Sequence, residues 1–319
     1  MDGFQHRPVM AREVLELLVP VPAGTVVDAT VGGGGHAHLL LEARPDVALL
    51  GIDRDADAVA AARERLAPFG DRVRIVHGGF EDVADIVRRG IGGPKSEGNI
   101  MGILFDLGTS SPQLDRPERG FSYWGEAPLD MRMDAAQELT AAAVVNEYSE
   151  ARLAELIKTN GEERFARQIA ARIVASRPLR TTADLVDAVK EAVPARARRR
   201  GGHPARRTFQ AIRMEVNREL PNLAEGLDES VHLLAPGGRV LVLAYHSLED
   251  RLVKERFASW AGTREQLPPG MPVEPERNGL VRLLTRRPMR PRVDEVAANP
   301  RARSARLRAA ERLAARAGS

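Results

Sequence analysis

The sequence predicts an α/β protein: a mostly parallel sheet whose last strand is antiparallel, with an inserted all-helical domain. In the stretch VVDATVGGGGHAHLLL (26–41), an apolar run ends in Asp28, four glycines follow, and a helical pattern begins. Strand, tight glycine turn and helix in this order open a nucleotide-binding βαβ unit. Further short apolar runs alternate with helical patterns up to residue 106, which favours parallel strands. Residues 115–215 show only helical patterns and loops, after which strands resume.

Composition restricts the classes of protein and of site. The chain has 319 residues, of which 43% are hydrophobic and 29% charged, as in soluble globular proteins. It contains no cysteine, which excludes disulfides, thiolate metal sites and cysteine nucleophiles. No apolar run approaches the roughly 18 residues of a membrane helix, and the N-terminus lacks a signal-peptide pattern. We therefore expect a cytoplasmic protein without a membrane partner.

Charge is distributed unevenly along the chain, whose formal net charge is +3. Residues 1–110 carry 11 Lys/Arg and 16 Asp/Glu, so the remaining residues are strongly basic. Residues 194–213 contain seven arginines and no acid, and residues 282–308 contain nine arginines against two acids. Such stretches are often only solvated surface, but two of them beside a ligand-binding domain also suit nucleic acid.

The elements expected before residue 115 follow from periodicity and turn signals. A helix over 6–18 precedes the first strand, and another follows the glycines. The later strands and one further helix are expected over 48–52, 56–66 (the helix), 73–76 and 100–105.

Residues 115–215 are expected to form the helical insertion, which opens with a loop over 115–135 of the long kind that tends to be functional. Ser149 and Thr182 are expected to cap two helices, and Phe165 begins the apolar face of another. The arginine-rich segment 196–207 is expected to be a loop on this domain.

Residues 1–114 and 216–319 are expected to form one domain around the insertion. Its second part should begin with a helix over 223–234, a Pro-Gly-Gly turn over 236–238 and a buried strand over 239–244. A helix over 247–260, capped by Ser247, and a sixth strand over 280–285 should follow. The alanines of 304–313 favour a helix. The architecture instead requires a last antiparallel strand there, which we favour.

Two ligand classes fit the glycine loop. The spacing Gly32-x-Gly34-x-x-Ala37 matches the dinucleotide fingerprint in its alanine form, as in an NAD-dependent oxidoreductase. Asp28, four residues before the first glycine, would repel a pyrophosphate. It suits a ligand that carries an ammonium group and no phosphate, such as S-adenosylmethionine (SAM). In the simplest alternative, Asp28 only accepts hydrogen bonds from loop amides.

Further polar and aromatic side chains follow expected strands, at the edge where open α/β sheets bind ligands. Asp53 is placed to bind the two ribose hydroxyls of an adenosine, or to cap the next helix. Phe80 can stack on adenine or be an ordinary core residue. Asp106 opens the stretch DLGTSSPQLD. His246 could act as a general base, but a histidine at a strand end is more often hydrogen-bonded structure.

Eight motifs in one order resemble the bacterial RsmH (MraW) family. They are DATVGGGGH (28–36), DLGTSSPQLD (106–115), ERGFS (118–122), PLDMRMD (128–134), GEERFA (161–166), RTFQAIR (207–213), HSLEDR (246–251) and NPRARSA (299–305). The resemblance covers most of the chain. Members are SAM-dependent methyltransferases that modify the N4 of a cytidine in the decoding region of 16S rRNA.

The resemblance implies a Rossmann-like class I methyltransferase sheet, SAM as methyl donor without a metal, and 16S rRNA within the small ribosomal subunit as partner, with no DNA. The SAM contacts that it implies are Gly34, Gly35, His36, Asp53, Phe80, Asp106 and Gln113. His36 could equally be a helix-start residue. Gly33 departs from the family, because many members carry an arginine or another side chain there; we expect a looser loop and the same ligand.

The expected mechanism is direct transfer of the methyl group to the cytosine N4. The N4 lone pair is delocalised into the ring, so an acceptor for the N4 hydrogens would favour attack. Asp106 is the candidate, alone or with backbone carbonyls of 107–112; alternatively it serves only SAM. Amino-methylating enzymes generally use a [DNS]-P-P-[YF] loop here, which SSPQ (110–113) resembles without its aromatic residue. The base is therefore expected to stack on Phe121, Tyr123 or Trp124.

The helical insertion is expected to hold the RNA around an unstacked base, with phosphates bound by arginines of both basic stretches. Arg198, Arg199 and Arg200 are the candidates in the insertion, and the alternative is that they only confer solubility. An RNA-binding assembly factor that keeps a SAM site without turnover is a further alternative function.

Overall fold

The chain divides into two compact units. The computed structural model describes residues 8–90, 99–109, 113, 116–198, 202–262 and 279–314. One unit comprises Met1–Gly108 and Leu220–Ser319, and the other comprises Thr109–Glu219. The second unit therefore includes residues 109–114 and 216–219 besides the expected insertion 115–215.

The described residues of the first unit form a seven-stranded sheet of order β3-β2-β1-β4-β5-β7-β6. Its strands are β1 (Thr25–Asp28), β2 (Ala48–Asp53), β3 (Val73–His77), β4 (Ile100–Asp106), β5 (Leu234–Ala244), β6 (Val281–Leu283) and β7 (Arg306–Arg312). The first five strands pair in parallel, whereas β7 is antiparallel to β5 and to β6. The expected fold class, including the antiparallel last strand, is confirmed.

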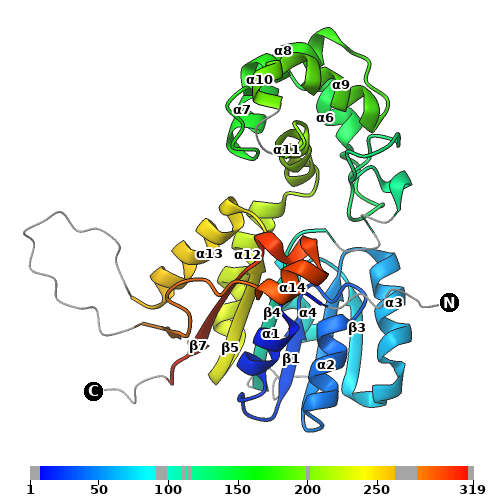
Figure 1. Cartoon of the computed structure of the whole chain (residues 1–319). Helices are drawn as coiled ribbons and strands as arrows, with labels where there is room; N and C mark the ends of the chain where they lie inside the picture. Colours follow the sequence, from blue (N-terminus) through cyan, green and yellow to red (C-terminus); the bar gives the residue numbers. More distant parts are fainter. Residues whose placement is uncertain are drawn as a thin grey trace, which may run out of the picture. The chain divides into compact units, whose positions relative to one another are not determined.

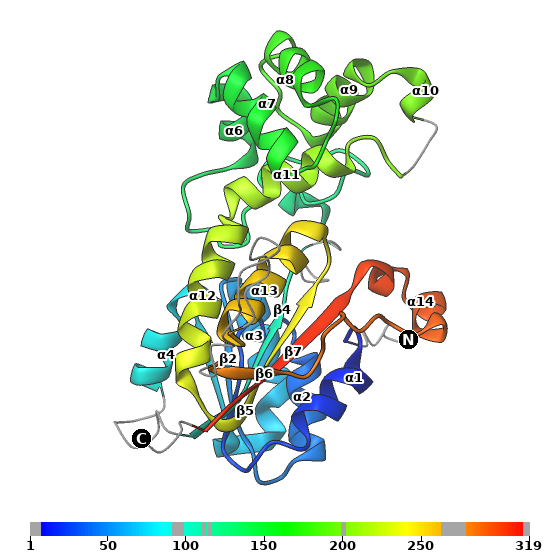
Figure 2. The same ribbon diagram turned by 90° about the vertical axis from the view of Figure 1, so that its left-hand side faces the viewer.

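Helices cover both faces of this sheet (Figures 1 and 2). On one face, the apolar side chains of the strands pack against α1 (Ala11–Leu18), α2 (Gly35–Ala43) and α3 (Ala56–Leu66). On the other they pack against α4 (Val83–Gly90), α12 (Glu219–Leu233) and α13 (Ser247–Trp260). The shorter elements are η1 (Ala67–Arg72), η2 (Phe80–Asp82), α14 (Val293–Ala298) and η5 (Pro300–Ser304). None of the helices in the described part of the chain has both the length and the hydrophobicity to span a bilayer.

The chain changes direction across the sheet at β1. It runs from β1 outward to β2 and β3, and then returns to the other side of β1 as β4. Asp28 lies opposite Gly51 of β2 and Leu104 of β4, so the ends of all three strands lie at one edge. In open α/β sheets, ligands bind outside the carboxyl ends of the strands at such a switch point.

Tertiary pairing makes 306–312 a strand although alanine-rich sequence favours helix. The strand lies between β5 and β6, and both of its backbone edges are paired. Arg308 is only 7% exposed, and its guanidinium donates to Asp250 of α13 over 2.7 Å. Arg306 donates to the same carboxylate over 2.9 Å. Burial alone would raise the pKa of Asp250, but the hydrogen bonds from these two arginines lower it.

The expected N-cap is found in one of two helices of the second unit and lies at the neighbouring residue in the other. Ser149 caps α7 (Glu150–Thr159), as expected, by accepting from the backbone N–H of Arg152. Thr182 does not cap α9 (Thr182–Ala192), because Thr181 has the extended backbone of a cap and forms a capping box with Asp184. Thr182 is the first helical residue and is fully buried, where its hydroxyl accepts from the Ala127 N–H over 3.0 Å.

Two caps of the first unit also lie beside the expected residue. Asp55, not Asp53, caps α3 by accepting from the Asp57 N–H. His246, not Ser247, caps α13, because its ring accepts from the Glu249 N–H while the Glu249 carboxylate accepts from the His246 N–H. A capping box of this kind satisfies two N–H groups that the helix itself cannot pair.

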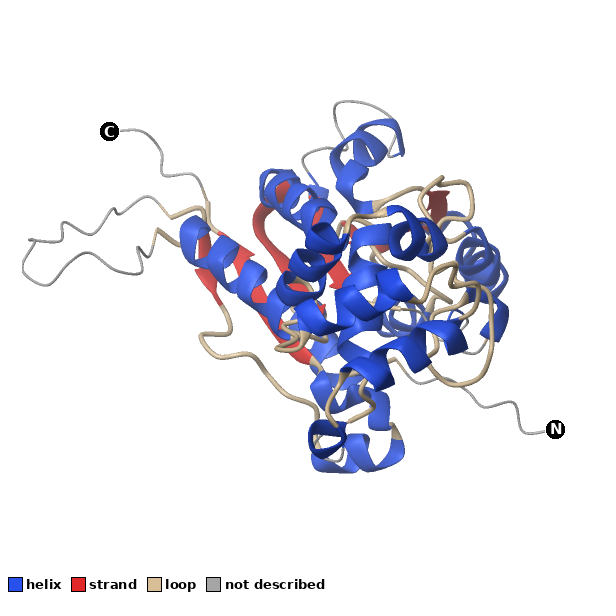
Figure 3. Ribbon diagram, turned by 90° about the horizontal axis from the view of Figure 1, so that it is seen from above, coloured by secondary structure: helices blue, strands red, loops and turns tan. Residues whose placement is uncertain are grey.

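The described elements of the second unit are helices joined by loops. Figure 3 shows the helices of the whole chain in blue and its strands in red. They are η4 (Pro117–Arg119), α6 (Ala141–Glu147), α7, α8 (Ala166–Ala175), α9, α10 (Ala195–Arg198) and α11 (Arg206–Val216). The unit has a hydrophobic core of its own, in which Ile157, Ile169 and Ile212 are fully buried. The expected loop over 196–207 is wrong in part, because both its ends are helical; residues 199–201 lie outside the described residues.

Asp250→Asn should destabilise the protein by about 3–5 kcal/mol near neutral pH, because it leaves the buried Arg308 guanidinium without a counter-charge. The difference from the wild type should shrink as the pH falls below the ordinary carboxyl pKa, since the lowered pKa of Asp250 stabilises only its ionised form. Urea unfolding at several pH values measures both effects. The control is Glu16→Gln, which removes an exposed ion pair with Arg12 and should cost less than about 1 kcal/mol. Equal losses for both variants would contradict the assigned role of Asp250.

Candidate active site

Three carboxylates converge where β1, β2 and β4 end. Asp28, Asp53 and Asp106 are the last residues of these strands. They are close enough for Asp53 and Asp106 each to raise the pKa of Asp28. The edge of the sheet at the switch point therefore concentrates acidic groups, whose negative charge in the ionised form would attract a positively charged ligand group.

The glycine loop between β1 and α2 follows a path that side chains would oppose. Gly32 and Gly34 have φ angles of +51° and +75°, in the left-handed region that favours glycine. A Cβ atom on Gly34 would also lie 3.2 Å from Cγ of Leu66. At Gly33, by contrast, nothing lies within 4 Å of the position of a Cβ atom, so there is space for a side chain at this position.

Asp28 is a buried carboxylate whose pKa lies near neutral pH. It is 3% exposed, and its Oδ1 accepts from the Thr30 N–H over 3.2 Å. Burial raises its pKa to about 7, although the nearby His36 and this hydrogen bond lower it. Asp28 thus accepts a hydrogen bond from a loop amide, as in the alternative in which this is its only role. A cationic ligand group would also stabilise its ionised form.

Asp53 joins the end of β2 to the glycine loop. Its Oδ2 accepts from the Gly32 N–H over 2.8 Å, and its Oδ1 accepts from the Asp55 N–H over 2.9 Å. Burial raises the pKa of Asp53, although these two hydrogen bonds lower it in part. A carboxylate offers about four lone-pair sites, so these bonds leave capacity for hydroxyl groups of a ligand.

Asp106 is held between two aromatic side chains. The Tyr245 hydroxyl donates to its Oδ1 over 2.7 Å, and the Nε2 of His36 lies 3.6 Å from its Oδ2. Its own N–H donates to the Thr30 hydroxyl over 2.6 Å. Burial and the nearby Asp106 raise the pKa of Tyr245 well above its ordinary value, so its hydroxyl stays a donor. Our sequence analysis missed this contact, although Tyr245 follows directly after β5, the neighbour of β4.

The remaining SAM contacts that we expected fall in both units. Gly34 and Gly35 are the cap and first residue of α2, and His36 is the buried second residue. Phe80 is partly buried, its ring is nearly perpendicular to that of Phe105, and the Arg54 guanidinium lies over its ring. Gln113 is buried in the second unit at 4% exposure, and its SAM contact stays a prediction.

The expected substrate residues differ in accessibility. Phe121 is 7% exposed and packs in the core of the second unit, which speaks against stacking of a base on its ring. Trp124 is 70% exposed. Arg198 is exposed at the end of α10, whereas Arg199 and Arg200 lie outside the described residues.

Several other expected contributors are structural. The His246 ring lies over the start of α13, with Nε2 3.1 Å from Glu249 Oε1, in agreement with a structural role. In the basic stretch 282–308, Arg306 and Arg308 bind Asp250, and Arg282 binds Glu311 over 2.7 Å. These arginines stabilise the fold, so only part of the stretch can hold phosphates.

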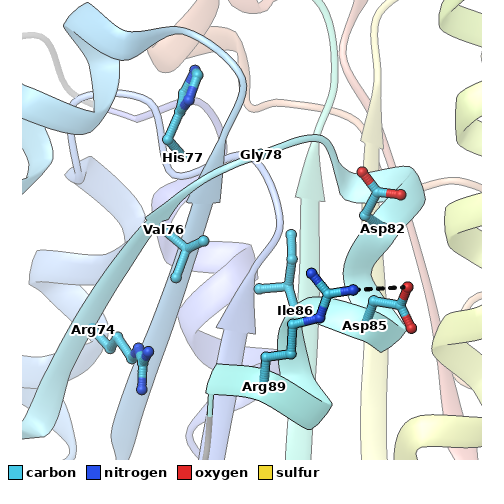
Figure 4. A pocket seen from close by; sticks show the side chains of 8 residues that line it. All are labelled: Arg74, Val76, His77, Gly78, Asp82, Asp85, Ile86 and Arg89. Carbon is cyan, nitrogen blue, oxygen red and sulfur yellow. Dashed lines mark ion pairs between the residues drawn. The ribbon is translucent and has the colours of Figure 1, made fainter.

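A cavity of about 360 Å³ lies between β3 and α4 (Figure 4). Its lining combines Arg74 and Arg89 with Asp82 and Asp85, and Arg89 pairs with Asp85 over 3.8 Å. None of the expected SAM contacts lines it. The ligand of the predicted site is therefore not expected in this cavity.

Comparison with known proteins gives consistent results along the whole chain. A family model described as the MraW methylase family matches residues 3–313. The "Ribosomal RNA small subunit methyltransferase H" of Symbiobacterium thermophilum is 51% identical, with 98% of each chain covered. The protein of the same name from Thermobifida fusca is 51% identical and covers 96% of this chain and 93% of its own. That of Kocuria rhizophila is 50% identical, with 97% and 94% covered.

Asp28→Asn should make the ligand-free protein more stable than the wild type above pH 7, by up to about 4 kcal/mol, because it removes the cost of a buried charge. The gain should vanish toward pH 4, where the wild-type side chain is also neutral. Thermal unfolding of both proteins from pH 4 to 8 measures this. Asp46→Asn is the control with the opposite sign, since a hydrogen bond from Arg44 lowers the pKa of Asp46. A gain that is independent of pH would contradict the assigned burial of charge.

Proposed function

The chain belongs to the MraW methylase family, and from this premise we propose that it is a SAM-dependent methyltransferase of small-subunit ribosomal RNA. Relatives that carry this activity in their names share about half of their residues with it over nearly the full length. We further propose that the methyl acceptor is the exocyclic N4 of a cytidine in the decoding region of 16S rRNA. The motif resemblance supports this finer assignment.

The residues at the strand ends fit SAM. Asp28 offers a buried carboxylate to the ammonium group, and Asp53 offers spare lone pairs to the ribose hydroxyls. The Nε2 of His36 is buried and has no hydrogen-bond partner among the described residues, so a polar group of the ligand can supply one. The same buried Asp28 disfavours a dinucleotide, whose pyrophosphate it would repel.

The methyl transfer requires activation of the acceptor nitrogen. SAM supplies an electrophilic sulfonium methyl group, so the reaction needs no metal. We propose that Asp106 accepts a hydrogen bond from the N4 amino group, which localises the lone pair toward the methyl carbon and stabilises the developing positive charge. Tyr245 uses one of the lone-pair sites on Oδ1 and leaves others to the substrate. As the N–C bond forms, the bond between the methyl carbon and sulfur breaks and the electron pair stays on sulfur. The methylated N4 then releases a proton to water, so a strong base is unnecessary.

The second unit is proposed to recognise the RNA. It carries the basic stretch 194–213, in which Arg198 and Arg206 are exposed on separate helices. Ribosomal RNA within the small subunit is the proposed partner, with no DNA and no membrane, and this substrate places the enzyme in the cytoplasm. Sequence-specific recognition of RNA usually targets unpaired bases, which the N4 reaction also requires.

The reaction is tested with labelled SAM and small ribosomal subunits that lack the modification. Free rRNA, tRNA and DNA serve as comparison substrates, and the products are digested to nucleosides and identified by mass spectrometry. We expect N4-methylcytidine from one site of the subunit. A different methylated nucleoside would refute the N4 assignment, and absence of label despite measured SAM binding would favour an assembly factor.

Asp106→Asn should lower kcat by about 10²-fold, the size typical when one preorganised electrostatic group is lost. The matched control is Tyr245→Phe, which removes the hydrogen bond to Asp106 but keeps the carboxylate, and should lower kcat by less than about tenfold. Single-turnover methylation and SAM affinity are measured for both variants. Full turnover of Asp106→Asn would exclude a catalytic role, whereas a loss confined to SAM affinity would leave Asp106 as a SAM contact only.

A further inference from the structure

Three ring systems gather on the surface of the second unit. His203 stacks on Tyr123 with 4.6 Å between ring centroids and 14° between ring planes. Trp124 meets the His203 ring edge-on at 4.9 Å. Because Trp124 is 70% exposed and the other two side chains are partly exposed, this aromatic platform of Tyr123, Trp124 and His203 presents ring surface to solvent.

The aromatic platform is held in place by its surroundings. Tyr123 rests edge-on against the buried Phe209 at 5.9 Å, which ties the platform to the hydrophobic core. The Ser122 hydroxyl oxygen accepts from the Trp124 N–H over 3.0 Å. The Nδ1 of His203 accepts from the Ala205 N–H over 3.3 Å, which fixes the ring at the start of α11. Rings that are fixed in advance lose little conformational entropy when a ligand binds.

Charged side chains of both signs flank the platform: Lys190 pairs with Asp187 over 3.3 Å, and exposed arginines precede and follow His203 in the sequence. Arg196 and Arg198 are exposed on α10, and Arg206 is exposed three residues after His203. Burial, and the positive charge of Lys190 close by, lower the pKa of His203. The imidazole is therefore neutral at pH 7 and stacks as a flat uncharged ring. Glu126 is an exposed acidic residue two positions after Trp124.

We propose that the aromatic platform stacks on an unpaired base of the RNA substrate, while Lys190, Arg198 and Arg206 contact neighbouring phosphates. Flat rings beside basic side chains are what proteins use to bind single-stranded RNA, because every base has a face that can stack. The proposal rests on the proposed function and deepens it. It gives His203 a role that our sequence analysis did not, and it replaces the buried Phe121 as the stacking residue.

The chain provides its own optical probe for this contact. It contains two tryptophans, Trp124 on the platform and Trp260, which is 7% exposed in the other unit. In a Trp260→Phe variant of the full chain, fluorescence therefore reports on Trp124 alone. The probes are a short oligocytidine RNA and an abasic ribose-phosphate oligomer of the same length. We expect oligocytidine to quench the fluorescence, and the abasic oligomer to bind by charge with little quenching.

His203→Ala in this background should weaken oligocytidine binding at least about fivefold, the lower limit for loss of one stacked base. Binding of the abasic oligomer should hardly change. His203→Phe keeps a ring at this position and should retain most of the affinity, which separates stacking from misfolding. His232→Ala, on the exposed surface of α12, is the matched control and should bind as the parent does.

Three outcomes would overturn the proposal: equal quenching by both oligomers, unchanged affinity of His203→Ala, or loss of affinity that His203→Phe does not restore. Small-subunit methylation by the wild type, measured in parallel, separates the two hypotheses. Methylation without quenching would overturn only the platform and would point to ribosomal protein or another RNA contact. Quenching without methylation would overturn the proposed function and leave an RNA-binding surface.

Discussion

The burial of carboxylates at one edge of the sheet is the constraint on which the candidate site depends. Burial is the largest cause of the raised pKa of both Asp28 and Asp53, and the neighbouring carboxylates add to it at Asp28. The strand order places Asp28, Asp53 and Asp106 together, and each is held by hydrogen-bond donors of the protein itself. Main-chain N–H groups of the glycine loop serve the first two, and Tyr245 serves the third. The remaining negative potential favours a ligand that brings positive charge. Binding of such a ligand and the stability of the site are therefore coupled.

The features of the site that depend on local sequence were predictable, whereas those that depend on long-range pairing were not. Strand ends and the glycine loop follow from short apolar runs and from glycines, so Asp53 and Asp106 could be placed from sequence. The Tyr245 contact joins residues 139 positions apart, and no local pattern marks it. Three helix caps were predicted one or two residues away from their observed positions. Neighbouring residues such as Thr181 and Thr182 have side chains that are equally able to cap a helix. Only the backbone conformation distinguishes them.

The aromatic residues of the second unit illustrate the same limit. Phe121, Tyr123 and Trp124 lie within four positions of one another, and sequence gave no reason to separate them. The fold buries Phe121 in the core and exposes Trp124, and it brings His203 onto Tyr123 from the start of another helix. Residues 110–112, from which carbonyl acceptors were expected, lie outside the described residues. The second unit thus has a core and surface of its own, while all the proposed SAM contacts except Gln113 lie in the first unit.

The position of β7 between β5 and β6 also constrains the order in which the protein can assemble. Strand β6 pairs with β7, so it has no place in the sheet until residues 306–312 have been synthesised. Until then the backbone edge of β5 that pairs with β7 is unpaired, and Asp250 of α13 has no ion pair with Arg306 or Arg308. Exposed edges of this kind invite pairing with other chains. During translation the sheet therefore stays open beside β5 until residues 306–312 are available to pair, and its closure is a late event in folding.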